Sequence, residues 1–384
     1  MMRKFILPLL FSVSIIFISC QRMNYTRNEK DIYVNMVKNE NSLAFSSFLN
    51  GYKAIVLSNN MPDALIENPD RLLFTDNRIF VMDRSGNKVL MFDGSGKFLR
   101  STANRVGKGH NEYIGVMDAA VDEKDGKLYV QCDAPYQMMV FDLDLNLEKV
   151  IPMDDYMREI AVDDDYIYGI CYNDQGKEGY RLVVTDKHHP ETKATTVISY
   201  ENVISGRWTS GKSLMPCASG GVYVCLPFDT HIYKVKEGEI VESFNMDFGA
   251  EGLIENPISK GATSQWFDRN CRDLNWSIVN MTGNDSIMIF NTNREYAFIM
   301  DMYRSECKGY LNWYNDLLPF SCSRIIPTSG IKNGIVYLFY SGSIVDALKK
   351  HAEKKAAPLS PVLRDIKEKF DPNGNPLIIV WTFR

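Results

Sequence analysis

The sequence predicts an all-β fold, namely a six-bladed β-propeller with four-stranded blades and a short helical insertion in the last blade. The first observation behind this prediction is an internal repeat: "IFVMDRSGNKVLMFD" (79–93) aligns without gaps with "LYVQCDAPYQMMVFD" (128–142). Each half of the repeat is a short apolar run, and the turn-forming residues Gly, Pro and Asp lie between the halves. The repeated unit is therefore a β-hairpin, and a further short strand follows each copy, at 97–99 and 147–151.

The second observation is that weaker copies of this hairpin continue along the chain. An aliphatic residue followed by a larger one opens the hairpin at Ile79-Phe80, Leu128-Tyr129, Ile167-Tyr168, Val222-Tyr223, Ile287-Met288 and Val336-Tyr337. Six copies at intervals of about 40 to 65 residues fit four-stranded propeller blades. A β-sandwich is the alternative, but it gives no reason for one hairpin to recur six times.

The third observation concerns the two segments that lack the blade pattern. Residues 247–276 are expected to form an irregular insertion between the fourth and fifth blades. Residues 343–370 show helical spacing of apolar residues, interrupted by Pro358 and Pro361, which predicts two short helices within the sixth blade. The last strand is expected over 377–383. It should pair with an N-terminal strand from 31–36 or 53–57, so that the ring closes and leaves no long open edge. Residues 31–384 would then form a single domain.

The N-terminus has the pattern of a bacterial export signal. Arg3 and Lys4 precede an apolar run over 5–18, which is shorter than the roughly 20 residues that a membrane span needs. Ser19 then precedes Cys20, an arrangement that resembles a lipobox. We therefore expect residues 1–19 to be removed, Cys20 to carry lipid, and 20–30 to act as a linker to a domain anchored in the envelope, in the outer membrane. An ordinary signal peptide with an incidental cysteine is the alternative.

The composition excludes several kinds of partner. After Arg3 and Lys4 are set aside, 41 basic and 48 acidic residues remain, without a cluster of Lys and Arg. Nucleic-acid binding, which depends on such clusters, is therefore not expected. Seven cysteines follow Cys20 and no C-x-x-C pair occurs, so a structural zinc site is not expected either. A disulfide between Cys217 and Cys225 stays open, and a monomer without a cofactor is expected.

The chain resembles the six-bladed β-propeller lipoproteins of Bacteroidetes, which are relatives of NHL-repeat propellers. The resemblance covers most of the mature chain and includes "IVLSNN" (55–60), "VLMFDGSGKFLRS" (89–101), "GKGHNEY" (107–113) and "NPLIIVWTFR" (375–384). The glycine-rich segment of that family usually reads G-x-G-P-G-E-Y. Here His110 and Asn111 replace its Pro and Gly, so a role tied to that backbone shape does not carry over directly.

The segment "RVGKGHNEY" (105–113) is the main candidate for a functional site. It has neither the spacing of a P-loop nor enough nearby ligands for zinc, and no metal is expected there. It crosses from the outermost strand of the first blade to the innermost strand of the second. In propellers this crossing shares a face with the turns between the second and third strands, here the turns of Arg84 and Tyr136. Gly107 and Gly109 would allow a tight bend. The side chains of His110, Glu112 and Tyr113 would either lock the neighbouring blade or contact a ligand.

The sequence contains no recognisable catalytic motif. G-x-S-x-G and H-E-x-x-H are absent, and the five histidines are scattered. We therefore expect a non-catalytic binding or scaffolding module, for glycan or peptide ligands. One alternative is a propeller lyase, lactonase or hydrolase, which needs carboxylates or histidines gathered at the inner strands; the sequence shows no such gathering. Another is a subunit of a larger envelope complex that docks through the two insertions.

Overall fold

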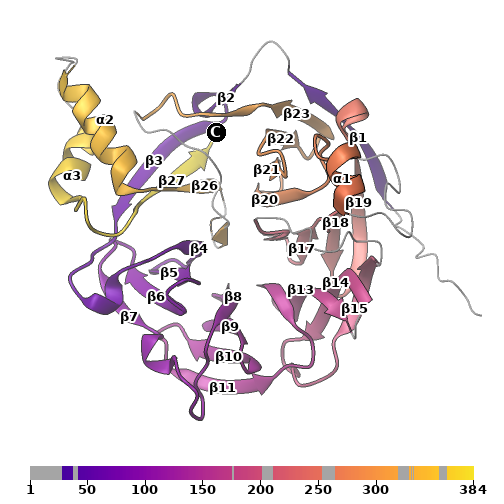
Figure 1. Ribbon diagram of the computed structural model, residues 1–384, viewed down its shortest axis with the longest axis horizontal. Helices are drawn as coiled ribbons and strands as arrows, with labels where there is room; N and C mark the ends of the chain where they lie inside the picture. The colour runs from indigo at the N-terminus through magenta and orange to yellow at the C-terminus, as the bar shows by residue number, and fades with distance from the viewer. Residues whose placement is uncertain are drawn as a thin grey trace, which may run out of the picture.

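The computed structural model places the β-sheets side by side in a ring around a central axis (Figure 1). It describes residues 28–37, 42–174, 177–200, 211–252, 264–318, 328–329, 331, 333–353 and 361–384. The predicted signal peptide and Cys20 lie outside these residues. Among the described residues, no helix is both long and apolar enough to cross a membrane.

Three sheets follow the predicted hairpins in sequence order. The first has the order β25-β4-β5-β6-β7, the second β8-β9-β10-β11 and the third β12-β13-β14-β15. The strands of the first sheet are β25 (Thr328–Ser329), β4 (Pro69–Phe74), β5 (Arg78–Asp83), β6 (Lys88–Asp93) and β7 (Phe98–Ser101). Those of the second are β8 (Val116–Asp122), β9 (Lys127–Asp133), β10 (Tyr136–Asp142) and β11 (Leu147–Pro152). Those of the third are β12 (Met157–Val162), β13 (Tyr166–Asp174), β14 (Lys177–Asp186) and β15 (Thr195–Tyr200).

The next two groups of four strands are joined into one nine-stranded sheet by β1 (Glu29–Met36). The first group is β16 (Leu214–Pro216), β17 (Val222–Val224), β18 (His231–Lys236) and β19 (Glu239–Asp247). The second is β20 (Ile278–Gly283), β21 (Ile287–Thr292), β22 (Ala297–Asp301) and β23 (Glu306–Tyr310). The first part of β1 pairs in parallel with β19, and its last part pairs in parallel with β23. A two-stranded pairing of β2 (Ser42–Ala44) with β24 (Asn312–Tyr314) continues this N-terminal path.

The ring closes between the two ends of the chain (Figure 1). Strand β27 (Leu377–Phe383) pairs antiparallel with β26 (Gly334–Phe339) on one side and with β3 (Leu49–Val56) on the other, where Ile379 lies opposite Ala54. The predicted closure through residues 53–57 is therefore confirmed, whereas residues 31–36 pair elsewhere, as β1.

Two helices lie between β26 and β27 and appear together at the outside of the ring in Figure 1: α2 (Ser341–Glu353) and α3 (Pro361–Lys369). They fall where the apolar spacing predicted them. The buried side chains of Ile344 and Ile366 pack in the same core cluster as Trp381. The segment over 247–276 is not wholly irregular, since it contains α1 (Ser264–Asn270), whose Phe267 packs against Trp276. Helix α1 is only seven residues long and buries one large apolar side chain, Phe267, so its sequence shows no helical repeat of apolar residues.

The core consists of apolar layers between neighbouring sheets. One cluster, for example, combines Leu73 and Phe80 of the first sheet with Val116 and Val130 of the second. Such layers follow from strands that are apolar on both faces. Single-turn 3-10 helices lie at the connections: η1 (Phe45–Ser47), η2 (Pro62–Ala64), η3 (Ala103–Arg105) and η4 (Gly249–Glu251). Cys217 and Cys225, whose pairing the sequence left open, are both free thiols here.

Candidate functional site

A β-bulge recurs near the start of three successive inner strands. The pairing register shifts between Pro69 and Arg71 in β4, between Val116 and Asp118 in β8, and between Met157 and Glu159 in β12. A bulge inserts one residue and turns the side chains beside it away from strict alternation. In each of these strands a charged residue follows the shift, which is unusual for strands whose other positions are mostly apolar.

These charged residues meet one another. Arg71 Nη1 lies 2.7 Å from Asp118 Oδ2, and Lys212 Nζ lies 3.1 Å from the other oxygen, Asp118 Oδ1. Arg71 is 2% exposed and Asp118 is fully buried. The buried carboxylate of Asp118 therefore forms ion pairs with two cations, Arg71 and Lys212, which come from two other parts of the ring. We refer to Arg71, Asp118, Glu159 and Lys212 as the axial charge cluster.

Backbone groups complete the cluster. Asp118 Oδ2 accepts a hydrogen bond from the Ile160 N–H at 2.8 Å, and Arg71 Nη1 donates to the Ile160 carbonyl oxygen at 2.8 Å. Glu159 Oε2 accepts from the Ser213 N–H at 2.6 Å. The Lys212 N–H donates to Asn280 Oδ1 in β20 at 3.1 Å. The cluster thus connects β4, β8, β12, the residues before β16, and β20.

The two carboxylates of the cluster differ in their electrostatics. Burial opposes the charge of Asp118, but the neighbouring Arg71 and Lys212 outweigh burial and hold the pKa of this carboxyl below its usual range. For Glu159, burial is dominant and raises the pKa, with the charge of Asp118 acting in the same direction and Lys212 opposing it. Asp118 is consequently held as an anion, whereas protonation of Glu159 is favoured relative to an exposed glutamate.

A second group of side chains lies directly beside the cluster. Met117 precedes Asp118 in the chain, and its sulfur accepts from Arg84 Nη2 at 3.7 Å and from the Tyr156 hydroxyl at 3.2 Å. The ring of Tyr156 lies 4.8 Å from that of Tyr136, at an interplanar angle of 44°. Asp70, which precedes Arg71, accepts from the Arg84 N–H at 3.2 Å. We refer to Asp70, Arg84, Met117, Tyr136 and Tyr156 as the rim site.

The charges of the rim site act on one another and on the cluster. Burial raises the pKa of Asp70, and the charges of Lys212 and Arg84 oppose this rise. Burial also raises the pKa of the Tyr156 hydroxyl, on which Arg158, Asp133, Tyr136 and Arg84 all act. The rim site therefore combines one cation, one carboxylate and two aromatic rings.

Within the predicted segment 105–113, Tyr113 locks two sheets together. Its side chain is fully buried in the apolar cluster shared by the first and second sheets. Its hydroxyl lies 2.6 Å from Thr102 Oγ1, which also accepts from the Val89 N–H at 2.9 Å. The backbone of the segment doubles back on itself, because the Gly107 N–H donates to the Tyr113 carbonyl oxygen at 2.9 Å.

The remaining side chains of the segment do not join the rim site through any described contact. The Glu112 carboxylate folds over its own loop and accepts from the Gly109 N–H at 2.6 Å. A Cβ atom on Gly107 or Gly109 would collide with this carboxylate. The glycines therefore make room for Glu112, and Asn111 is the residue with left-handed backbone, at φ 60°. His110 is exposed.

Of the residues predicted for the site, the structure thus brings together Arg84 and Tyr136. It adds Asp70, Met117 and Tyr156, which the sequence did not single out. The sequence shows no gathering of carboxylates at the inner strands, but in the structure Asp118 and Glu159 lie near enough to act on each other electrostatically. A signal was available: Arg71, Asp118 and Glu159 each lie eight to ten residues before the opening of their hairpin.

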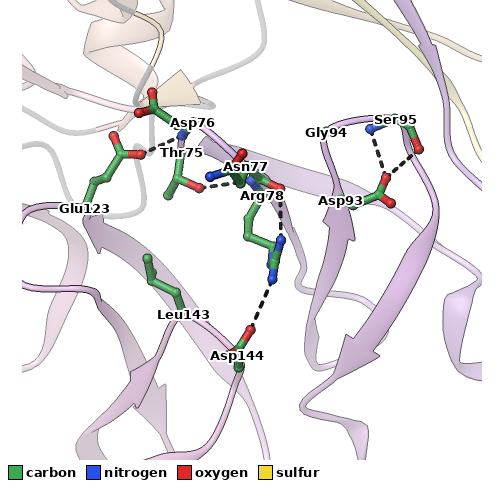
Figure 2. A pocket seen from close by; sticks show the side chains of 10 residues that line it. All are labelled: Thr75, Asp76, Asn77, Arg78, Asp93, Gly94, Ser95, Glu123, Leu143 and Asp144. Atoms are coloured by element: carbon green, nitrogen blue, oxygen red, sulfur yellow. Dashed lines mark hydrogen bonds and ion pairs between the residues drawn. The ribbon is translucent and has the colours of Figure 1, made fainter.

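A separate open cavity of about 720 Å³ lies at the turns β4–β5, β6–β7, β8–β9 and β10–β11 (Figure 2). Three of the four acidic side chains that line it are engaged by their surroundings. Glu123 accepts from the Asp76 N–H, Asp144 pairs with Arg78 at 3.3 Å, and Asp93 accepts from the Ser95 N–H. Among the described residues, no group of three or more His, Cys, Asp or Glu is arranged to hold a metal ion.

Antiparallel four-stranded sheets arranged around one axis, with charged side chains converging from the inner strands, define a β-propeller-like protein. The chain belongs to the family described as a domain of unknown function (DUF4934), whose model matches residues 29–382. It matches none of the curated proteins.

The fold is similar to that of a solved Bacteroides fragilis protein inferred to be exported. The TM-score is 0.66 at 15% identity, with 93% of this chain and all of that chain covered. Similarity to BamB of Moraxella catarrhalis has a TM-score of 0.40 at 10% identity and covers 67% of this chain and 65% of BamB. For the WD40 β-propeller domain of Doa1 the TM-score is 0.41 at 11% identity, with 77% and 78% covered.

Proposed function

We propose that this chain is an envelope lipoprotein whose six-bladed β-propeller binds a ligand at the rim site without transforming it. Six blades follow if the nine-stranded sheet counts as two blades that β1 joins, and if β26, β27 and β3 count as the sixth. Kinship with the NHL-repeat propellers of Bacteroidetes is part of this proposal. The observation that carries the binding function is the rim site itself: Arg84 and Tyr156 contact the sulfur of Met117, and the ring of Tyr136 packs against that of Tyr156.

A binding role is favoured over catalysis by the engagement of the carboxylates. Asp118 is occupied by Arg71, Lys212 and the Ile160 N–H, and Glu159 Oε2 by the Ser213 N–H. A general base needs a lone pair directed at a substrate proton. Both oxygens of Asp118 and Oε2 of Glu159 instead connect inner strands, which gives the rim site a rigid base.

The location follows from the sequence. The apolar run over 5–18 and the Ser19-Cys20 junction support export and lipidation on Cys20. Anchoring in the outer membrane is part of the same proposal. Inferred export of the Bacteroides fragilis protein of similar fold is in keeping with this. Replacement of Cys20 by Ala should release the protein from membranes into the soluble fraction, and continued membrane attachment would contradict lipid anchoring.

The binding function is tested by affinity capture with the full chain against glycans, peptides and envelope extract. We expect a ligand to be retained by the unaltered protein and lost by the double variant Tyr136→Ala, Tyr156→Ala. The matched control is Asn77→Ala with Glu123→Ala, which alters the cavity of Figure 2 and should retain the ligand. Recovery of chemically converted ligand would contradict a non-catalytic binding role and would support the alternative, a propeller lyase, lactonase or hydrolase.

A third function, docking into a larger envelope complex, has its own signature in the same experiment. Its contacts would come from the segment over 247–276 and from α2 and α3. Deletion of these segments should then abolish recovery of a protein partner and spare small ligands. If the ligand is lost in the double variant Tyr136→Ala, Tyr156→Ala and retained after these deletions, the result supports binding at the rim site.

A further inference from the structure

The guanidinium of Arg84 has most of its hydrogen-bonding capacity unused. Its described side-chain contact is with the sulfur of Met117, and a thioether is a weak acceptor. Among the described residues, no carboxylate forms an ion pair with it, although Asp70 lies close enough to accept from the Arg84 backbone. Arginine donates in a planar fork that matches the two oxygens of a carboxylate. An anionic group on a ligand is therefore the complementary partner of Arg84.

An aromatic surface lies beside this cation. The ring of Tyr136 is half exposed and is supported by Tyr156, and both Tyr156 and Arg84 contact the same Met117 sulfur. Ile114 is 46% exposed, and its N–H bonds to the carbonyl oxygen of Ala134 in the Tyr136 turn. Exposed aromatic and aliphatic groups of this kind suit a ligand ring with an apolar face and a polar edge.

The carboxylate of the rim site and a second one near it determine what else the ligand can carry. Asp70 belongs to the rim site, and Asp133 Oδ1 is buried without a hydrogen-bond donor among the described residues. Asp133 also acts electrostatically on the Tyr156 hydroxyl. Asp70 can accept hydrogen bonds from the hydroxyl groups of a ligand, and the two negative charges together repel additional anions. A polyphosphate would thus be disfavoured, whereas one carboxylate on a ring with several hydroxyls satisfies both kinds of group.

Resting on the proposed binding function of the rim site, we propose that its ligand is an acidic saccharide of the uronic-acid class. The sugar carboxylate pairs with the fork of Arg84, one face of the sugar ring stacks on Tyr136, and ring hydroxyls donate to Asp70. Specificity then comes from Arg84, and the stacking area comes from the tyrosine pair.

The test is calorimetric titration of the full chain with tetramers of galacturonic, mannuronic and guluronic acid. The comparison ligands are a neutral galactose tetramer and tetraglutamate, which carries carboxylates without sugar rings. We expect at least one uronate tetramer to bind at least 10-fold more tightly than both comparison ligands. Arg84→Gln should weaken it by about 10- to 100-fold, as loss of a charge-assisted pair does. Arg84→Lys should recover only part of the loss, because lysine lacks the fork.

Two further variants separate the roles. Tyr136→Ala should weaken the uronate and the neutral tetramer alike, since stacking does not depend on the carboxylate. Arg78→Gln is the matched control at the cavity of Figure 2 and should bind as the unaltered protein does. Equal binding of the neutral tetramer, tighter binding of tetraglutamate, or no binding of any uronate would overturn the saccharide assignment. Retention of another ligand that depends on Tyr136 and Tyr156 would in that case leave the binding function of the rim site standing.

Discussion

At the scale of single residues, the most informative group is the buried carboxylate of Asp118. Burial of a charge costs several kcal/mol unless partners compensate, and a buried ion pair is weak evidence for added stability. Here one carboxylate accepts from Arg71, from the Ile160 N–H and, at its other oxygen, from Lys212. Its role is therefore best understood as fixing which inner strands meet at the axis.

Replacement of Asp118 by Asn keeps the shape of the side chain and removes its charge. Arg71 would then be buried without a counter-ion, so we expect the free energy of unfolding to fall by about 3–5 kcal/mol. The matched control is Asp144→Asn, whose side chain is 68% exposed and pairs with Arg78. That change should cost about 1 kcal/mol or less. Urea titrations compare the two, and a loss below 1 kcal/mol for Asp118→Asn would contradict the role of the cluster.

The pH dependence of stability should reflect Asp118 and Glu159 with opposite signs. Because the pKa of Asp118 is lowered by folding, its stabilisation is present above the unfolded value of about 3.9 and is lost as the pH falls through the folded value. The pKa of Glu159 is raised by burial. Its stabilisation is complete below the unfolded value of about 4.3 and is lost as the pH rises through the folded value.

Glu159→Gln should therefore abolish the part of the stability loss that accompanies a rise in pH above about 4.3. Urea unfolding measured between pH 4 and pH 8 checks this. Glu123→Gln is the control, because Glu123 is exposed at the cavity of Figure 2, and it should keep the slope of the unaltered protein. The same slope in Glu159→Gln would show that Glu159 does not titrate as its burial requires.

At the scale of elements, the hairpins were predictable and the bulges were not. Hairpins such as β5–β6 and β9–β10 repeat a local pattern of apolar runs and turns, which is visible without knowledge of the fold. The turns also identified Arg84 and Tyr136. Bulges interrupt alternation only where a partner strand is present, so Asp118 and Glu159 looked like isolated charges. Tyr156 lies before β12 in a segment without local pattern, and only packing brings it to Tyr136.

Strand β1 is the element whose role depends most on long-range contacts. Its buried face carries Ile32 and Val34, which are 0% and 3% exposed, and its other face carries Tyr33, which is 71% exposed. Lys30 forms an ion pair of 2.6 Å with Glu242 in β19. Because β1 pairs with β19 and then with β23, it holds two groups of strands together at their outer edges.

We expect Ile32→Ala to lower the free energy of unfolding by about 2–4 kcal/mol through the cavity it leaves between β1 and its neighbours. Tyr33→Ala, one residue away on the exposed face, should change it by less than about 0.5 kcal/mol. Hydrogen exchange should show faster exchange at backbone amides of β19 and β23 in Ile32→Ala only. Equal effects of the two substitutions would mean that β1 does not join these strands.

At the scale of the whole molecule, the N-terminal part of the chain runs along the outer side of the ring. Strand β1 joins β19 and β23, β2 pairs with β24, and β3 pairs with the C-terminal β27 (Figure 1). Each of these pairings joins parts of the chain that are more than 200 residues apart in sequence. Closure of the ring therefore depends on contacts between distant parts of the chain, and the pairing of β3 with β27 has the longest sequence separation of these.

This arrangement makes the contact of β27 with β3 the expected place of first opening. Trp381 in β27 is fully buried, and its ring lies 5.0 Å from that of Tyr52 in β3 and 5.4 Å from that of Phe45. Trp381→Ala should lower the free energy of unfolding by about 3–5 kcal/mol. Native-state hydrogen exchange should show amides of β3 and β27 losing protection before those of β9 and β10. The neighbouring exposed position provides the control, since Thr382→Ala removes no buried contact. Uniform loss of protection around the ring in Trp381→Ala would mean that the ring unfolds as one unit and has no preferred point of opening.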